Sequence, residues 1–257
     1  MASLGRSARG AGALLVACSL LAALPAAPAL GLSKTACRVT NTDTTTVFTT
    51  FQAAVAAATA GQHLTVRGVC HGITAIHVSL TITGIRPGKA ARPTLNGDKG
   101  GTVLTIDGSA SVAIGSLTIT GGQGSELGGA IVISGGSLSL TNVRLRGNQA
   151  GEGGGLYAAG SAVTINGRTS IDHNTASYGG GISFGGGAMT LNDAASVHDN
   201  TARMAGGILN NGGAVTFNDT TSIHHNTATD TLADGFGGGG FYNDFGGLVS
   251  FGDSSSV

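Results

Sequence analysis

The stretch 145–226 decides the fold, because one four-residue pattern returns in it at a fixed interval of 26 residues. An aliphatic residue, two variable residues and an asparagine occur as LRGN at 145–148, IDHN at 171–174, VHDN at 197–200 and IHHN at 223–226. A fixed period of this length indicates a repeat architecture, in which each unit stacks on the next.

Each unit also contains a glycine-rich segment ending in a hydrophobic residue and, further on, a short alternating segment. The glycine-rich segments are GGAI at 128–131, GGGL at 153–156, GGGI at 179–182, AGGI at 205–208 and GGGF at 238–241. The alternating segments are LSL at 138–140, VTI at 163–165, MTL at 189–191 and VTF at 215–217. Three short apolar segments per unit, separated by glycine or asparagine, exclude helices here. They predict an all-β parallel β-helix with three strands per turn and turns about 4.8 Å apart.

The composition agrees with such stacking and narrows the function classes. The 257 residues include 46 glycines, only 10% are charged, and the formal net charge is zero. Stacked turns place equivalent residues together, so a charge repeated at one position would repel its neighbour. A chain without surplus cations is not expected to bind nucleic acid, and a hydrophobic share of 41% argues against disorder.

Residues 1–29 are predicted to be a secretory signal peptide, which implies a secreted or cell-surface protein. Arg6 and Arg9 precede the apolar run 11–24, and Ala-Pro-Ala at 27–29 offers a cleavage site. The sequence LVAC ending at Cys18 also resembles a bacterial lipobox, so lipid anchoring there is an alternative. The apolar run is shorter than a membrane span of about 20 residues. We therefore expect no transmembrane segment in the mature chain.

Residues 30–62 are predicted to form an N-terminal segment with a capping helix, and residues 63–257 the β-helix. The helix is expected over 47–60, with its N-cap among 44–46 and its C-cap at Gly61. A solenoid needs its first open apolar end covered, which gives this helix its role.

Two further features concern cysteines and the end of the chain. Cleavage leaves Cys37 and Cys70, which predict a disulfide in an oxidising compartment, with two buried free thiols as the alternative. The segment 248–253 begins another repeat strand before the sequence ends at Val257, so we expect a truncated reading frame.

The repeated asparagines are predicted to form a structural ladder at a corner of the β-helix. Asparagine tolerates left-handed backbone, and its amide can bond the adjacent turn. The ladder residues are Asn148, Asn174, Asn200 and Asn226.

The motifs resemble those of a known group of proteins. The signal peptide, AGQHLTV at 60–66 and the alternation of GGAI or GGGI with I-x-x-N resemble secreted bacterial proteins with right-handed parallel β-helix repeats, of the pectate-lyase-like superfold. They are similar in particular to the polymorphic outer-membrane-protein repeats, whose hallmarks are GGAI and FxxN. The resemblance covers about residues 36–257, with aliphatic residues at the phenylalanine position, and implies an adhesin-like function.

Enzymes of the same fold cleave polysaccharides with clustered carboxylates that act as acid and base or hold Ca²⁺. Asn-Thr-Asp at 41–43 resembles an element of polygalacturonases, but it precedes the expected helix. No Asp-Asp pair occurs, and carboxylates are sparse near Arg144, Arg146 and Arg168. The sequence leaves open whether the protein is an enzyme, but the sparse carboxylates argue against it. No cofactor is expected.

A column of imidazoles and carboxylates precedes the corner asparagines and is a candidate Zn²⁺ or Ni²⁺ site. The alternative is that these are corner residues that are polar because they face water. The column consists of Asp172, His173, His198, Asp199, His224 and His225.

Three smaller signals remain. The segment 121–126 resembles a single copy of a Ca²⁺-binding nonapeptide, and a lone copy is most simply a turn. The insertion 229–237 lengthens one repeat and forms either a surface loop or part of a binding face. Thr164, Thr190 and Thr216 are expected as an outward column on a sheet.

These observations favour a non-catalytic, secreted or cell-surface structural and adhesive module. It would present a rigid polar wall to an extracellular glycan or to a protein of a host or neighbouring surface. Contacts would be broad, because the chain has no tryptophan and only 4% aromatic residues. The alternative is a carbohydrate-active polysaccharide lyase or glycoside hydrolase of the pectate-lyase-like fold.

Overall fold

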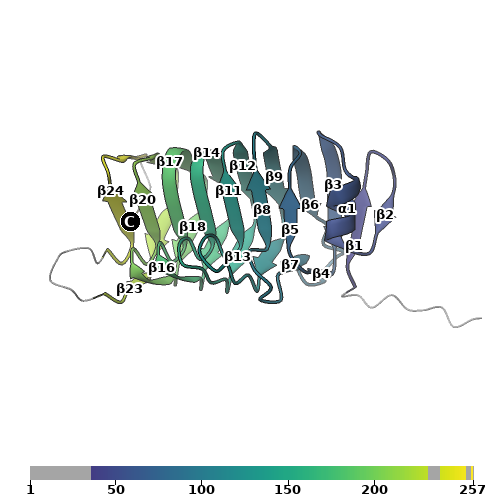
Figure 1. Ribbon diagram of the computed structural model, residues 1–257. Coiled ribbons are helices and arrows are strands. Elements are labelled where there is room, and N and C mark those ends of the chain that lie inside the picture. Colours follow the sequence, from purple (N-terminus) through teal and green to yellow (C-terminus); the bar gives the residue numbers. More distant parts are fainter. Residues whose placement is uncertain (1–35, 231–237, 253–255, 257) are drawn as a thin grey trace, which may run out of the picture. The chain divides into compact units, whose positions relative to one another are not determined.

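The computed structural model describes residues 36–230, 238–252 and 256. The predicted signal peptide with Cys18 and most of the insertion 229–237 lie outside the described residues. The structure is all-β, with 53% strand and 3% helix, and winds into a parallel β-solenoid of about 6 turns (Figure 1). The predicted β-helix is therefore confirmed.

The described strands form three sheets, and within two of them all pairings are parallel. The largest sheet has 15 strands, namely β1 (Arg38–Asn41), β2 (Val47–Phe48), β3 (Gln62–Arg67), β5 (Thr74–Ile76), β6 (Leu80–Gly84), β8 (Leu104–Asp107), β9 (Ser111–Gly115), β11 (Ile131–Ser134), β12 (Ser137–Thr141), β14 (Leu156–Asn166), β17 (Ile182–Leu191), β20 (Ile208–Asn211), β21 (Ala214–Phe217), β24 (Phe241–Asp244) and β25 (Leu248–Phe251). The second has seven, namely β4 (Val69–His71), β7 (Thr94–Asn96), β10 (Thr118–Thr120), β13 (Arg144–Arg146), β15 (Ser170–Asp172), β18 (Ser196–His198) and β22 (Ser222–His224). The third has three, namely β16 (Thr175–Tyr178), β19 (Thr201–Met204) and β23 (Thr227–Ala228).

The repeat period fixes the register between turns. Leu145, Ile171, Val197 and Ile223 are directly opposite one another in β13, β15, β18 and β22. Their exposed fractions are 0, 0, 0 and 4%, so this column faces the core. The flanking residues of each strand face outward, because side chains alternate along a strand. The seven-stranded sheet therefore has an apolar inner face and a polar outer face.

Two strands are longer than the sequence pattern suggests. β14 and β17 each continue from the glycine-aliphatic segment into the alternating segment, so that β14 pairs with both β11 and β12. Gly160 in β14 and Gly186 in β17 have φ of +58° and +74°. Glycine permits this backbone and allows the strand to turn from one face of the solenoid to the next without ending.

The glycine triplets serve two purposes. Gly179 has a φ of +60°, as a tight turn requires. Gly181 instead lacks room: a Cβ there would lie 2.7 Å from the Val197 side chain and 2.8 Å from the Gly207 carbonyl oxygen. The first glycine of the triplet is therefore needed for the tight bend of the backbone. The last is needed because successive turns of the solenoid approach closely there.

The N-terminal cap differs from the prediction. The helix α1 spans Phe51–Ala57, with Thr50 as N-cap and Ala58 as C-cap, so the expected bounds 47–60 were too wide and both expected caps were wrong. The reason is a tight turn after β1, in which the Asn41 carboxamide oxygen accepts hydrogen bonds from the backbone N–H groups of Asp43 and Thr44. The turn returns Val47–Phe48 as strand β2, antiparallel to β1.

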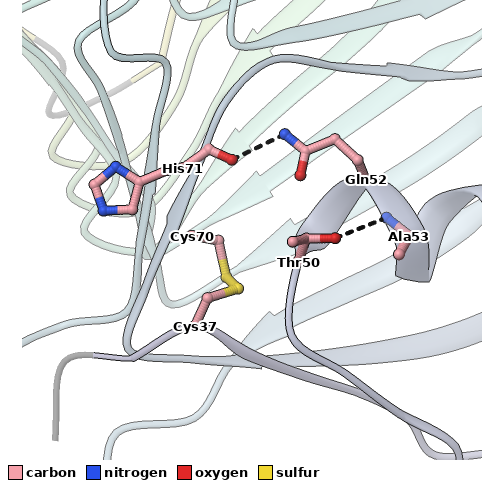
Figure 2. Close-up of a disulfide and its surroundings, with 6 residues drawn as sticks. All are labelled: Cys37, Thr50, Gln52, Ala53, Cys70 and His71. Carbon is pink, nitrogen blue, oxygen red and sulfur yellow. Dashed lines mark hydrogen bonds between the residues drawn. A yellow bond between two sulfur atoms is a disulfide. The ribbon is translucent and has the colours of Figure 1, made fainter. Parts of the chain in front are cut away.

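The cap covers the first turn with strands as well as a helix. β1 pairs antiparallel with β3, the first strand of the solenoid wall. Phe51, Ala54 and Val55 of α1 are buried, and Gln52 donates to the His71 carbonyl oxygen at 2.9 Å (Figure 2). The cap thus joins the hydrogen-bond network of the wall.

The disulfide prediction is confirmed. Cys37 and Cys70 are bonded with a Cα–Cα distance of 4.6 Å (Figure 2). The bridge ties the segment before β1 to β4. A disulfide of this kind is typical of oxidising compartments and compatible with an extracellular location. Among the described residues, no helix is long and apolar enough to span a membrane.

Candidate functional site

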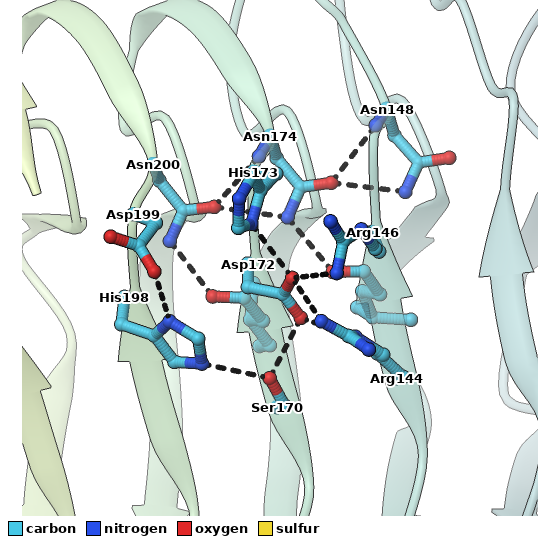
Figure 3. A network of polar contacts seen from close by, with 12 residues as sticks. Arg144, Arg146, Asn148, Ser170, Asp172, His173, Asn174, His198, Asp199 and Asn200 are labelled. Carbon is cyan, nitrogen blue, oxygen red and sulfur yellow. Dashed lines mark hydrogen bonds and ion pairs between the residues drawn. The ribbon is translucent and has the colours of Figure 1, made fainter.

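The asparagine ladder is present and lies inside the corner of the solenoid. Asn148, Asn174 and Asn200 have exposed fractions of 2, 0 and 0%. The Asn174 side chain donates to Asn200 at 3.0 Å and accepts from the Asn148 side chain at 3.0 Å (Figure 3). The same bond links Asn200 to Asn226 at 2.9 Å. The ladder holds the corner in place beneath the outward-facing polar residues.

The expected left-handed backbone does not lie at the asparagines. The positive φ values belong to the preceding residues, with 56° at His173, 53° at Asp199 and 53° at His225. The bend at this residue turns the next side chain inward, where the carboxamide reaches the neighbouring turn. Each repeat therefore exposes the side chain at the bend and buries the asparagine.

The six candidate metal ligands fall into two groups. His198 and His224 face outward from β18 and β22 with parallel rings whose centroids are 5.0 Å apart. His225 follows, with its Nδ1 2.8 Å from Nδ1 of His224. Asp199 Oδ2 lies 2.8 Å from Nδ1 of His198. The other two, Asp172 and His173, belong to the neighbouring network on β15.

The Asp172 carboxylate is buried and shared among several donors. Its exposed fraction is 0%, and Arg144 donates to both oxygens at 2.7 Å (Figure 3). Arg146 lies 3.4 Å away, and His173 2.9 Å away. Burial opposes ionisation, but the hydrogen bonds from Arg144 and Ser170 and the arginine charge outweigh it and hold the pKa of Asp172 below its ordinary value.

Within the described residues, no group of three or more His, Cys, Asp or Glu side chains is arranged to hold a metal ion. The Asp172 carboxylate is paired with Arg144, and the His173 ring also lies against this carboxylate. The column of alternating imidazoles and carboxylates is thus divided by pairing within and between turns. No metal chemistry is derived from it.

Ser170 joins the two groups of residues. Its Oγ lies 3.1 Å from Nε2 of His198, so that a serine, an imidazole and the Asp199 carboxylate follow one another, as in serine hydrolases (Figure 3). The Ser170 hydroxyl, however, donates to Asp172 at 2.7 Å, and its N–H is bound to the Val143 carbonyl oxygen. A hydroxyl that donates to a carboxylate is not activated by the imidazole, and this N–H cannot serve an oxyanion. We derive no catalytic step from the arrangement.

His198 contacts one group at each ring nitrogen. Its Nδ1 faces the Asp199 carboxylate, and its Nε2 faces the Ser170 hydroxyl, which donates to Asp172.

A polar hollow of about 590 Å³ lies at the turns beside the third sheet. Its side chains come from successive turns, with Gln123 opposite Gln149 in a parallel bridge. The remaining lining is small-residue backbone, and none of its lining residues is acidic. The side chains that line it are Lys99, Gln123, Ser125, Gln149 and Ser177.

The base of the hollow is backbone held by hydrogen bonds between turns, and two side chains around it have no partner among the described residues. Gly124 N donates to the Gln149 carbonyl oxygen at 2.9 Å, and Gln149 N to the Gly122 carbonyl oxygen at 2.9 Å. A Cβ on Gly151 would lie 2.6 Å from the Glu126 carbonyl oxygen, so glycine is the residue that fits at this point of the base. Within the described residues, the carboxamides of Gln123 and Gln149 have no hydrogen-bond partner.

Sequence reasoning missed this hollow. It read the segment 121–126 as a simple turn, and that segment supplies part of the lining. The signal that could have found it is the pair Gln123 and Gln149, which are one repeat apart and follow the corner residues. The predicted threonine column, in contrast, is present: Thr164, Thr190 and Thr216 are in register on the largest sheet.

Comparison with protein-family models, with curated proteins and with solved structures gives no match to this chain.

Proposed function

We propose that this chain is a non-catalytic module of the cell surface or extracellular space that binds a glycan in the polar hollow. The observation that carries the proposal is the set of unpartnered side-chain amides and hydroxyls around a space of about 590 Å³. Carboxamides can bond the hydroxyl groups of a sugar as donor and acceptor.

The stacked turns support binding by keeping the lining in place. Gln123 and Gln149 extend from backbone that is hydrogen-bonded to neighbouring turns. Side chains on an ordered scaffold lose less freedom on binding than those on a loose loop. Lys99 adds one cation at the rim, which suits a sugar that carries a carboxylate or sulfate.

Secretion is part of the proposal. The predicted signal peptide and the disulfide support an oxidising location. The resemblance to polymorphic outer-membrane-protein repeats agrees with an adhesive function on a cell surface.

The test is a titration of purified protein against a panel of neutral and acidic oligosaccharides. We expect the double variant Gln123→Ala/Gln149→Ala to weaken the best ligand at least about tenfold, since two hydrogen-bonding groups are lost. The matched control, Thr164→Ala/Thr190→Ala, removes two side chains from another face and should keep wild-type affinity. Equal affinity of the two variants would refute the assignment of the hollow, and release of new reducing ends would contradict the non-catalytic part.

A further inference from the structure

The outer face of the seven-stranded sheet carries a second, separate group of residues. We define the imidazole strip as His173, His198, His224 and His225, flanked by the arginines of β13. We propose that the imidazole strip is a binding site for an acidic polysaccharide that engages it when the imidazoles are protonated. The inference does not depend on the glycan proposed for the hollow.

The geometry of the imidazole strip suits a linear ligand. His198 and His224 repeat at the spacing of one turn, with parallel rings 5.0 Å apart. His225 is at the corner beside His224, and the strip continues through His173 toward Arg146. Along the axis on which turns stack, the carboxylates Asp172 and Asp199 lie between these groups, and each is paired within the protein. A polymer with repeated anionic groups can contact several of the cationic groups on either side of them at once.

The charge of the imidazole strip changes with protonation. Two arginines, Arg144 and Arg146, are opposed by two carboxylates, Asp172 and Asp199. With neutral histidines these charges cancel. Histidine is the side chain whose ordinary pKa lies between about pH 5 and 8, so a face that carries several imidazoles gains positive charge in mild acid. The charged residues of the adjoining β19 turn, Arg203 and Asp230, pair with each other.

In the free protein the surroundings of His224 disfavour its protonation, and a bound anion would reduce this effect. Burial, together with the neighbouring His198 and His225, lowers the pKa of His224, while Asp199 acts in the opposite direction. A bound carboxylate or sulfate supplies the missing negative charge and raises the pKa again. Proton uptake and anion binding are therefore linked, each favouring the other.

The ligand class follows from what the imidazole strip lacks. Binding of single-stranded nucleic acid depends on aromatic side chains on which bases stack. The strip and its flanking positions contain imidazole, guanidinium, hydroxyl and carboxylate groups, and no Phe, Tyr or Trp. An acidic polysaccharide needs only charge and hydrogen bonds, which these residues supply.

The test measures binding of the wild-type protein to polyuronate (alginate) at low salt, at about pH 5.5 and about pH 8, with neutral dextran and a single-stranded DNA oligonucleotide as competitors. We expect polyuronate to bind at least about tenfold more tightly at the lower pH, because binding takes up protons. Calorimetry in two buffers of different ionisation enthalpy should record that uptake.

The variant His198→Gln/His224→Gln should strongly reduce the difference between the two pH values, because it removes the two stacked imidazoles of the strip. The control His77→Gln removes a histidine outside the strip, which pairs with Asp107, and should keep the difference. Circular dichroism checks that each variant is folded, and proton uptake by the wild type remains decisive if the double variant fails to fold. Affinity without pH dependence, equal binding of dextran, tighter binding of the oligonucleotide, or no binding would each overturn the proposal. The hollow variant Gln123→Ala/Gln149→Ala should bind polyuronate normally, which separates this proposal from the first.

Discussion

Replacing one rung of the buried asparagine ladder should destabilise the protein far more than its single side chain suggests. The Asn174 carboxamide makes four hydrogen bonds across two turns. Its oxygen accepts from the backbone and side-chain N–H groups of Asn148, both at 3.0 Å. Its nitrogen donates to the Leu145 carbonyl oxygen and to Asn200, both at 3.0 Å. In Asn174→Ala, water has little access to replace them, because the residue is fully buried.

The magnitude follows from which partners are left without a bond. The backbone N–H of Asn148 loses the acceptor it has in Asn174, and an unsatisfied buried donor costs about 1–3 kcal/mol. The Asn148 side chain keeps its bond to the Ile119 carbonyl oxygen, and Asn200 keeps the bond from the backbone of residue 174. Adding the three remaining lost bonds at about 1 kcal/mol each, Asn174→Ala should lower the free energy of unfolding by about 4–6 kcal/mol.

A second asparagine ladder provides the matched control. Asn192 donates to Asn166 at 2.8 Å and accepts from Asn218 at 2.9 Å, but it is only partly buried. Because water can replace these bonds, Asn192→Ala should cost about 1 kcal/mol or less. Urea unfolding gives both values, and amide hydrogen exchange should show loss of protection at Asn148 only in Asn174→Ala. Equal losses of unfolding free energy in the two variants, or unchanged amide exchange at Asn148, would refute the argument that burial of the ladder determines its contribution to stability.

Two further predictions concern buried polar groups. The Thr221 hydroxyl is buried without a hydrogen-bond partner among the described residues, so Thr221→Ala should leave the urea midpoint unchanged or raise it. Arg144→Met removes the main partner of a buried carboxylate and should cost about 2 kcal/mol at neutral pH, less than for a fully buried pair because Arg144 is partly exposed. The lowered pKa of Asp172 stabilises the fold above its ordinary value of 3.8, and this contribution is lost as the pH falls through the folded-state pKa. Stability measured against pH should therefore decline below about pH 4 in the wild type and less steeply in Arg144→Met; parallel curves would contradict the assignment.

The solenoid wall was predictable because its determinants are local and repeated. The 26-residue period places Leu145, Ile171, Val197 and Ile223 in register, and any other register would expose part of that column. The disulfide could also be predicted, as two cysteines remain after the predicted signal peptide. The sequence left two free thiols as the alternative, and the structure has the disulfide.

The cap and the site could not be predicted in the same way, because they depend on contacts that do not repeat. Periodicity suggested a helix from residue 47, but a side-chain-stabilised turn at Asn41 assigns Val47–Phe48 to a strand. The hollow forms where side chains of adjacent turns are left without partners, as at Gln149. The sequence shows which residues are one turn apart, but not which of them pair.

The outward-facing residues of the seven-stranded sheet illustrate how departures from the repeat generate a site. Where successive turns carry the same neutral residue, as in Ser170, Ser196 and Ser222, stacking is compatible with a regular wall. Where a turn carries the buried carboxylate Asp172, the preceding turn supplies cations, Arg144 and Arg146. At His224 and His225 the neighbouring group is another imidazole, and no carboxylate among the described residues forms an ion pair with either ring. Like charges that stack in a parallel solenoid repel one another, so an external anion should contribute most where histidine is stacked on histidine.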